Sequence, residues 1–249
     1  MLGINKNKKT KRKLTLLSEK SSFGYIEAYK SLRTNMTYLL KEKDDKTGQI
    51  IMIASSMPGE GKSNVSVNLS IALSQDNKRV ILLDCDLRKG TLHRYLNVPA
   101  LSAGITSVLN KESDLQSAIK HMSFGFDFMP VGTIPDNPSE LIGSTRMNTL
   151  LRVLSKNYDY VICDTAPVNA VSDTSILCRY MDGTILVVSH NDVSRNTALA
   201  AKEQLENSGA NILGVVLNRY DAKKTGTDAA GYYSYYNYST YEGYGDDQQ

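Results

Sequence analysis

The stretch SSMPGEGKS, residues 55–63, follows an apolar run and opens a helical pattern. Its glycines, Gly59 and Gly61, allow backbone N–H groups to converge on an anion, and the positive end of the following helix adds to that field. Lys62 is placed to reach the β- and γ-phosphates of a nucleotide, and the Ser63 hydroxyl to bind Mg²⁺. The stretch therefore predicts a phosphate-binding loop between a strand and a helix.

The loop departs from the full phosphate-loop pattern at one position, because Ser56 stands where that pattern has its first glycine. The order of strand, glycine-rich turn and helix is kept, and a GKS sequence in that context is far rarer than GKS alone. We therefore expect nucleotide phosphates to bind here. The residues predicted to bind them are Pro58, Gly59, Glu60, Gly61, Lys62, Ser63 and Asn64.

Apolar, β-rich runs recur along the chain, with helical patterns between several of them. One such pattern puts Val65, Leu69 and Ala72 on one face. Continuous apolar strands that alternate with helices indicate a parallel sheet covered on both faces. The predicted strands lie at residues 49–56, 79–86, 126–132, 158–167, 183–190 and 211–220. The fold class is therefore α/β, a three-layer phosphate-loop NTPase fold with a mainly parallel central sheet, whose ligands bind at the carboxyl ends of strands.

Two further segments complete the expected fold. Residues 20–45 predict a helix before the first strand. Residues 90–145 are expected to contain loops, because the two prolines of TIPDNPSEL, residues 133–141, oppose regular structure.

Carboxylates follow two of the predicted strands. Asp84 and Asp86 of ILLDCDLR are expected on the same face, since strand side chains alternate, and Arg88 beside them is placed to meet a phosphate oxygen. Asp164 ends another apolar run, where a Mg²⁺-organising aspartate is expected. Three carboxylates, one lysine and one hydroxyl predict a Mg-ATP site. Its catalytic residues are Lys62, Asp84, Asp86 and Arg88, and its metal ligands are Ser63, Asp84 and Asp164.

The chain closes on AAGYYSYYNYSTYEGYGDDQQ, residues 229–249, which is rich in tyrosine. Its other residues are small or polar, and neither a helical nor an alternating period fits the spacing. By composition this is a disordered, low-complexity tail whose tyrosines are presented and not buried. The tyrosines are Tyr232, Tyr233, Tyr235, Tyr236, Tyr238, Tyr241 and Tyr244.

Charge and cysteine content set limits on function. The net charge of +3 is too small to indicate a nucleic-acid partner. KNKKTKRK, residues 6–13, is either a solvated arm or a contact for anionic lipid or a juxtamembrane partner. Cys85, Cys163 and Cys178 lack metal-ligand spacing and suit a reduced compartment. No apolar run reaches the roughly 18 residues of a membrane span, and no signal peptide is recognised, so the expected location is cytoplasmic.

Taken together, these motifs resemble a bacterial tyrosine kinase of the capsular and exopolysaccharide family. That family combines a variant Walker A ending in GKS or GKT, a second motif of the form D-x-D-x-R, a Walker B aspartate and a C-terminal tyrosine cluster. The matching residues here are 61–63, 84–88, Asp164 and the tyrosines of the tail. PDNPSEL, residues 135–141, and VSDTSIL, residues 171–177, are also similar to family segments.

The resemblance implies an enzyme that uses Mg-ATP to phosphorylate protein tyrosines, its own tail included, and that regulates polysaccharide synthesis and export. It implies a homo-oligomer, a ring in the family, held by the motif in which this chain has Glu27, Lys30 and Arg33. Lysine replaces arginine at the middle position. Asn218 matches the position where related ATPases contact the adenine.

The resemblance also implies partners and a division of the chain. The partners are a transmembrane activator of the polysaccharide co-polymerase type, which recruits the kinase to the inner face of the membrane, and a cognate tyrosine phosphatase. The expected divisions are an arm and oligomerisation helix at 1–45, the kinase domain at 46–222 and the tyrosine tail at 223–249.

Three other functions are alternatives to the kinase. Cell-division and partition ATPases carry a signature lysine where this chain has Met57, and iron–sulfur carrier ATPases need paired cysteines, whereas no CxxC occurs here. The third alternative is an ATP-gated scaffold whose tail is phosphorylated by another kinase. Incubation of the purified chain with ATP separates the scaffold from the kinase.

Overall fold

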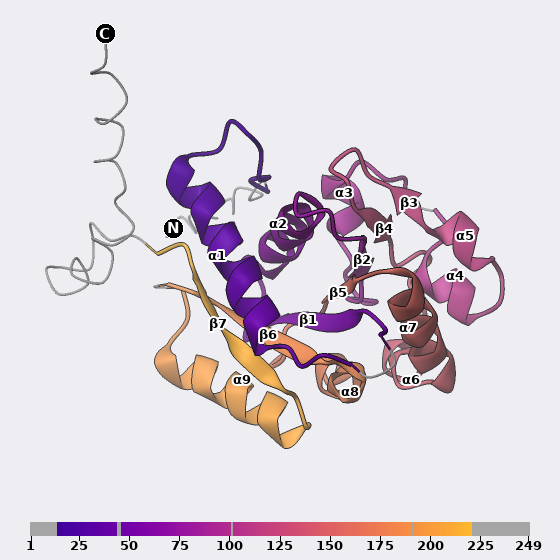
Figure 1. The fold of residues 1–249 in the computed structure, drawn as a ribbon. Helices are drawn as coiled ribbons and strands as arrows, with labels where there is room; N and C mark the ends of the chain where they lie inside the picture. Colours follow the sequence, from indigo (N-terminus) through magenta and orange to yellow (C-terminus); the bar gives the residue numbers. More distant parts are fainter. Residues whose placement is uncertain (1–13, 44–45, 101, 191, 221–249) are drawn as a thin grey trace, which may run out of the picture.

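A computed structural model describes residues 14–43, 46–100, 102–190 and 192–220. The predicted basic arm and the tyrosine tail lie outside these residues. Within them, a central sheet is covered by helices on both sides, which gives three layers (Figure 1). None of the helices in these ranges is long and apolar enough to cross a membrane.

The sheet has seven strands in the described residues, in the order β3-β4-β2-β5-β1-β6-β7. All neighbours pair in parallel except β3 and β4, which form a short antiparallel pair at the edge. The strands are β1 (Gln49–Ser55), β2 (Val80–Asp84), β3 (Lys120–His121), β4 (Asp127–Met129), β5 (Tyr160–Asp164), β6 (Gly183–Ser189) and β7 (Ile212–Asn218). The six predicted strands are therefore confirmed, and β3 is one that the sequence did not predict.

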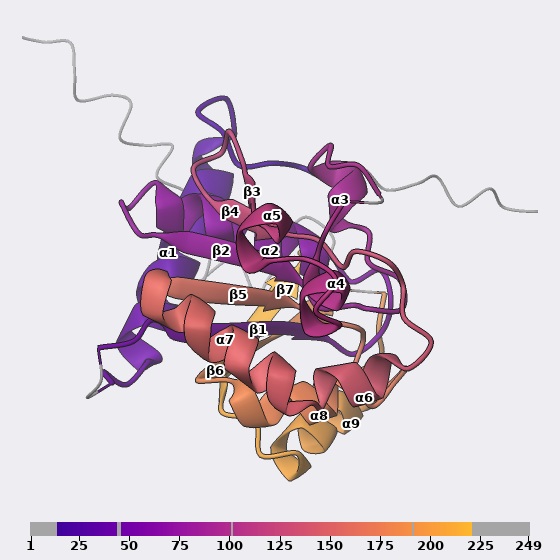
Figure 2. The same ribbon diagram turned by 90° about the vertical axis from the view of Figure 1, so that its right-hand side faces the viewer.

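Helices cover the two faces unequally. Apolar side chains of α1, α2 and α3 pack on one face, and those of α4 to α9 pack on the other. Figure 2 shows α1 and α2 above the sheet and α8 and α9 below it. These elements are α1 (Phe23–Leu39), α2 (Lys62–Ser74), α3 (Leu92–Tyr95), α4 (Ile105–Leu109), α5 (Leu115–Ala118), α6 (Pro138–Ile142), α7 (Thr145–Asn157), α8 (Asp173–Leu177) and α9 (Arg195–Asn207), with a 3-10 turn at Cys178–Tyr180.

One expectation about the prolines was wrong. The PDNPSEL segment contains a short helix, α6, which begins at Pro138. Proline is well placed at the first position of a helix, because its missing N–H would have no intrahelical partner there. Pro138 therefore starts regular structure instead of preventing it.

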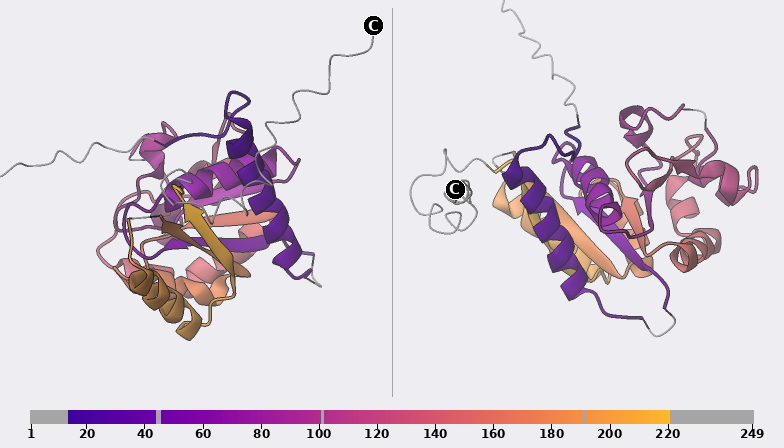
Figure 3. Two further views of the ribbon diagram at one scale, coloured as in Figure 1. Left: turned by 90° about the vertical axis from the view of Figure 1, so that its left-hand side faces the viewer. Right: turned by 45° about the horizontal axis from the view of Figure 1, so that its top comes forward.

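The helix before β1 belongs to the same packed unit as the sheet. It runs over Phe23–Leu39, inside the predicted 20–45, and lies beside α2 (Figure 3). Tyr29 and Met36 are buried in the core that α2 shares with the sheet. The chain leading into α1 is anchored as well, because Asn68 of α2 accepts from the backbone N–H of Leu17 (2.7 Å) and donates to the carbonyl of Thr15 (2.8 Å).

Asn68 is the centre of a buried polar network, and its amide nitrogen also lies within hydrogen-bond distance of the hydroxyls of Tyr25 (2.8 Å) and Tyr29 (3.3 Å). Replacing Asn68 by Ala removes the acceptor of the Leu17 N–H and a donor to the buried Tyr29 hydroxyl, so we expect it to lower the free energy of unfolding by about 2 to 3 kcal/mol. Urea denaturation measures the loss. Asn157→Ala is the control, because that amide donates only to Val153 of its own helix in an exposed position. Equal midpoints for the two variants would contradict the network's role.

Candidate active site

The loop between β1 and α2 has the backbone that the sequence predicted. Gly59 and Gly61 have φ angles of +90° and +95°, a region that favours glycine, and Lys62 is the first residue of α2. These two turns direct successive N–H groups to one side of the loop, at the positive end of a helix of 13 residues. The loop is therefore built to accept phosphate oxygens.

A buried carboxylate lies beside this loop. Asp164, at the end of β5, is 2 % exposed and accepts from Lys62 Nζ (2.7 Å), Ser63 Oγ (2.7 Å) and Ser66 Oγ (2.9 Å). Ser66 was not singled out from the sequence. It lies one helical turn after Lys62, so its spacing from the phosphate lysine is the signal that could have found it.

Asp84, at the end of β2, is the neighbour of Asp164 in the sheet register and is 1 % exposed. Its Oδ2 accepts from the backbone N–H of Leu92 (3.1 Å), while its Oδ1 is buried with no hydrogen-bond partner. Burial, followed by the charge of Asp164, raises the pKa of Asp84 to about 8. A buried carboxylate with one free oxygen beside a second carboxylate is an arrangement that a cation would stabilise.

Magnesium fits these residues, because hydroxyl and carboxylate oxygens are the ligands it prefers. Asp84, Asp164 and Ser63 could hold it, with the remaining positions left to phosphate oxygens and water. The described residues contain no cluster of three or more His, Cys, Asp or Glu suited to a metal ion, and a Mg-ATP site with three carboxylates stays a prediction. Strand β2 ends at Asp84, so Asp86 lies in the following turn, where it caps the N–H of Lys89 (3.0 Å).

Arg88 has a different environment from the one predicted. Its guanidinium forms a bidentate ion pair with Asp173 (2.7 and 3.1 Å) and donates to Ser139 Oγ (2.8 Å). Asp173 is 1 % exposed and also accepts from Ser139 (2.6 Å). The network joins the turn after β2 to α6 and α8. The sequence predicted a phosphate contact for Arg88 and did not indicate Asp173 or Ser139 as its partners.

Asn218 and Glu60, both predicted to contact nucleotide, are turned toward the loop itself. The Asn218 amide donates to the Glu60 carbonyl (2.8 Å). The buried Glu60 carboxylate accepts from Ser56 Oγ (2.9 Å) and from the N–H groups of Met57 (2.7 Å) and Ser189 (3.2 Å). These two side chains support the loop from outside the anion-binding face.

The predicted oligomerisation residues lie on α1 but are not equally free. Lys30 pairs with Glu27 (2.7 Å) on the helix surface. Arg33 is directed at α2, where it donates to the Ala72 carbonyl (2.8 Å) and lies 3.7 Å from Asp76. A subunit contact through these residues stays a prediction.

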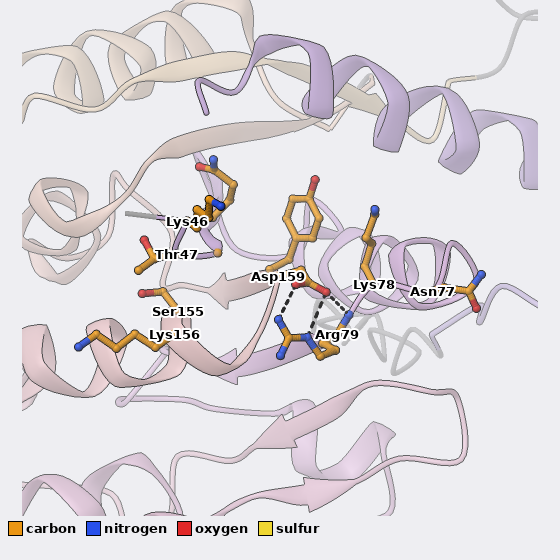
Figure 4. A pocket seen from close by; sticks show the side chains of 11 residues that line it. Lys46, Thr47, Asn77, Lys78, Arg79, Ser155, Lys156 and Asp159 are labelled. Carbon is orange, nitrogen blue, oxygen red and sulfur yellow. Dashed lines mark hydrogen bonds and ion pairs between the residues drawn. The ribbon is translucent and has the colours of Figure 1, made fainter. Parts of the chain in front are cut away.

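The opposite edge of the sheet has a hollow of about 340 Å³ with basic side chains (Figure 4). Helices α2 and α7 end beside it, at Ser74 and Asn157, so the negative ends of two helix dipoles point toward it. Lys78 and Lys156 complement those ends, and Arg79 pairs with Asp159 (2.7 Å). The lysines are explained by the helices, and the anion-binding edge is the one that carries the glycine loop.

Comparison with known proteins bears on this site. The family profile described as "ParA: NUBPL iron-transfer P-loop NTPase" matches residues 46–232. The tyrosine-protein kinase YwqD of Bacillus subtilis is 36 % identical over 222 residues, covering 87 % of this chain and 90 % of that protein. CpsD of Streptococcus agalactiae, also a tyrosine-protein kinase, is 32 % identical and matches 85 % of this chain and 89 % of its own length. The chain belongs to the bacterial tyrosine kinases of the capsule and exopolysaccharide family.

Solved structures agree with this kinase family. The kinase domain of the Escherichia coli tyrosine kinase Etk is 34 % identical, with a TM-score of 0.73 over 78 % of this chain and 74 % of that one. The septum site-determining protein MinD of Pyrococcus horikoshii, complexed with Mg-ADP, is 26 % identical with a TM-score of 0.59 over 70 % of this chain and 71 % of that one. The kinase thus has the fold of nucleotide-binding P-loop NTPases. It spans only 29 % of the longer Wzc kinase of Salmonella typhimurium.

We expect Lys62→Met to lower the rate of phosphotransfer by two to three orders of magnitude, because an electrostatic contact to the transferred group is worth about 3 to 4 kcal/mol. Phosphate incorporation from labelled ATP measures the rate, and circular dichroism checks that the fold is kept. Lys202→Met on α9, whose ammonium pairs with Glu206 at the surface, is the matched control. Normal phosphotransfer by the Lys62 variant would reject the assignment.

The raised pKa of Asp84 makes the stability of the fold depend on pH in Mg²⁺-free buffer without nucleotide. The folded kinase keeps a proton that the unfolded chain releases above the ordinary pKa of 3.8, so this stabilisation is complete below that pH and is lost as the pH rises to about 8. Asp84→Asn abolishes the titration. Its stability relative to the wild type should rise between pH 5 and 8, on the order of 1 kcal/mol per pH unit.

Urea denaturation at several pH values with a chelator present tests this difference. Asp114→Asn serves as the control, because the Ser117 N–H holds the pKa of Asp114 below its ordinary value, outside the tested window. Curves for Asp84→Asn and wild type that stay parallel would show that Asp84 is already ionised in the folded chain.

Proposed function

We propose that the kinase transfers the γ-phosphoryl group of Mg-ATP to the tyrosines of its own C-terminal tail, and that this controls capsule or exopolysaccharide synthesis and export. The observation that carries the proposal is the cluster of Lys62, Ser63, Asp84 and Asp164 at the glycine loop. The proposed acceptors are Tyr232, Tyr233, Tyr235, Tyr236, Tyr238, Tyr241 and Tyr244.

Each side chain of the cluster has a proposed role. Lys62 neutralises charge on the β- and γ-phosphates, exchanging its present partner Asp164 for phosphate oxygens. Ser63, Asp84 and Asp164 hold Mg²⁺, which supplies further neutralisation of the phosphates when bound. Asp84 also accepts the proton of the tyrosine hydroxyl late in the transfer, since that hydroxyl has a pKa near 10 and arrives protonated. The chemistry is positioning and charge neutralisation, as a loose transition state requires.

The topology supports access of the tail to this site. Strands β1, β6 and β7 are parallel, so β7 ends at the same edge as the glycine loop. About 20 extended residues span roughly 60 to 70 Å, enough to reach the chain's own site or that of a neighbouring subunit. We propose transfer to the neighbour in a homo-oligomer that uses Glu27, Lys30 and Arg33. Each phosphate adds about −1.5 to −2 charges, so a filled tail should be repelled from the carboxylates and loosen the assembly.

The capsule context supplies the remaining proposals. A transmembrane activator of the polysaccharide co-polymerase type would recruit the kinase to the inner face of the membrane, with the basic residues 6–13 as one contact. A tyrosine phosphatase would reset the tail, and other protein tyrosines would serve as substrates. Arg88 would contact a phosphate only if nucleotide binding releases it from Asp173. Asp86 would take part in catalysis from the turn after β2.

The alternative functions are less well supported. The MinD structures match with a lower TM-score and identity than the kinase domains. Met57 occupies the position of the partition-type signature lysine, and Cys85, Cys163 and Cys178 are buried free thiols without paired spacing. A scaffold phosphorylated by another kinase stays open to direct test.

Mass spectrometry of the purified chain after incubation with Mg-ATP tests the proposed function. In a mixture, a Lys62→Met chain with an intact tail should be labelled by an active chain whose seven tail tyrosines are Phe, and light scattering should show the labelled oligomer shrinking. Each chain incubated alone is the control. Label that appears only when site and tail are on one chain would reject transfer between subunits, and no label in the wild type would favour the scaffold.

A further inference from the structure

The end of β7 holds the glycine loop by its carbonyl groups. Arg219 donates from one terminal nitrogen to the Gly59 carbonyl (2.7 Å), and Asn218 donates to the Glu60 carbonyl (2.8 Å). The two donors are consecutive in the sequence, and so are the two acceptors. The end of strand β7 therefore contacts the glycine loop on the side that the Gly59 and Glu60 carbonyls face.

These two contacts set the direction of the loop's N–H groups. In a planar trans peptide the C=O of one residue and the N–H of the next point in opposite directions. A donor on the Gly59 carbonyl therefore aims the N–H of Glu60 to the other side, and a donor on the Glu60 carbonyl does the same for the N–H of Gly61. Those N–H groups belong to the turn that would surround the phosphates.

Arg219 is itself held in place. Its other terminal nitrogen donates to Asp192 (2.6 Å) and to Ser189 Oγ (3.2 Å), at the end of β6. Its backbone has a φ of +57°, an uncommon value for a residue other than glycine, and such outliers mark positions that the surroundings determine. The guanidinium fork thus joins the glycine loop to β6 and to the end of β7.

Gly61 shows how closely this support approaches. A Cβ atom added at Gly61 would overlap the Asn218 side-chain nitrogen, so the glycine is needed both for its positive φ and for this contact. Asn218 is held from both ends of its amide, because Nδ2 donates to the Glu60 carbonyl and Oδ1 accepts from the Arg219 N–H (3.0 Å).

We propose that Asn218 and Arg219 are positioning residues, which aim the amides of Glu60 and Gly61 at the phosphates of the bound nucleotide by holding the Glu60 and Gly59 carbonyls. The inference rests on the proposed nucleotide site. It predicts that losing either side chain weakens any ligand through its phosphates, whether or not a base is attached. A contact to adenine predicts the opposite pattern.

The test compares Mg-ATP, Mg-GTP and Mg-tripolyphosphate, each displacing a fluorescent ADP from the full chain. Arg219→Ala and Asn218→Ala should weaken ATP and tripolyphosphate by the same factor, about tenfold, since each removes a hydrogen bond that holds a charge-binding group. The ratio of ATP to GTP affinity should stay at the wild-type value. In kinase assays KM for ATP should rise, with kcat at saturating ATP changed less than KM.

Two further variants complete the design. Arg219→Lys keeps a single donor for the Gly59 carbonyl and should recover part of the affinity, so the test stands even if Arg219→Ala folds poorly. Arg179→Ala removes an arginine that also donates to a backbone carbonyl, that of Ile176, far along the chain from the loop, and should leave binding unchanged.

The outcomes separate this inference from the proposed function. Unchanged tripolyphosphate binding with an altered ATP to GTP ratio would overturn the positioning role and assign these residues to the base. A wild type that binds both ligands, with variants that lose neither, overturns this inference alone. A wild type that binds neither ligand overturns the proposed nucleotide site and this inference with it.

Discussion

A buried carboxylate needs a positive charge or hydrogen-bond donors beside it, and the donors to Asp164 fix how α2 packs against the sheet. The two oxygens of Asp164 accept from Lys62, Ser63 and Ser66, all from the first turns of α2. Removing one partner of a buried ion pair leaves an uncompensated charge, which is strongly destabilising. The start of α2 is therefore tied to the end of β5, and the same groups are the ones that a phosphate and its cation would engage.

The parallel sheet makes this arrangement possible because it separates two edges of opposite character. At the carboxyl edge the strands deliver Asp84, Asp164 and Asn218, and α2 begins there with its positive dipole end. Helices α2 and α7 end at the amino edge of the sheet, and Lys78 and Lys156 lie near these negative helix ends. This polarity of the helices favours anion binding at the carboxyl edge.

Support for the site comes from elements distant in sequence. Glu60 binds the loop to β6, Asn218 and Arg219 bind it to β7, and Arg88 joins the turn after β2 to α6 and α8 through Asp173. These contacts hold backbone groups and loops in position, so the site depends on the whole carboxyl edge and not on the glycine loop alone.

The glycine loop and the six main strands could be predicted from the amino-acid sequence, because they depend on local spacing and on the alternation of apolar runs. The ion pair of Lys62 with Asp164 was not predicted, since it joins residues about a hundred positions apart. The sequence placed Asp86 on a strand that ends at Asp84, and it took the prolines before α6 as breakers, since the ends of elements depend on neighbours that a local pattern does not contain. The partners of Arg88, Glu60, Asn218 and Arg219 follow from the packing of the folded chain. Long polar side chains reach several acceptors from one position, and packing of segments more than a hundred residues apart, as for Arg219 and Gly59, selects which acceptor is within reach.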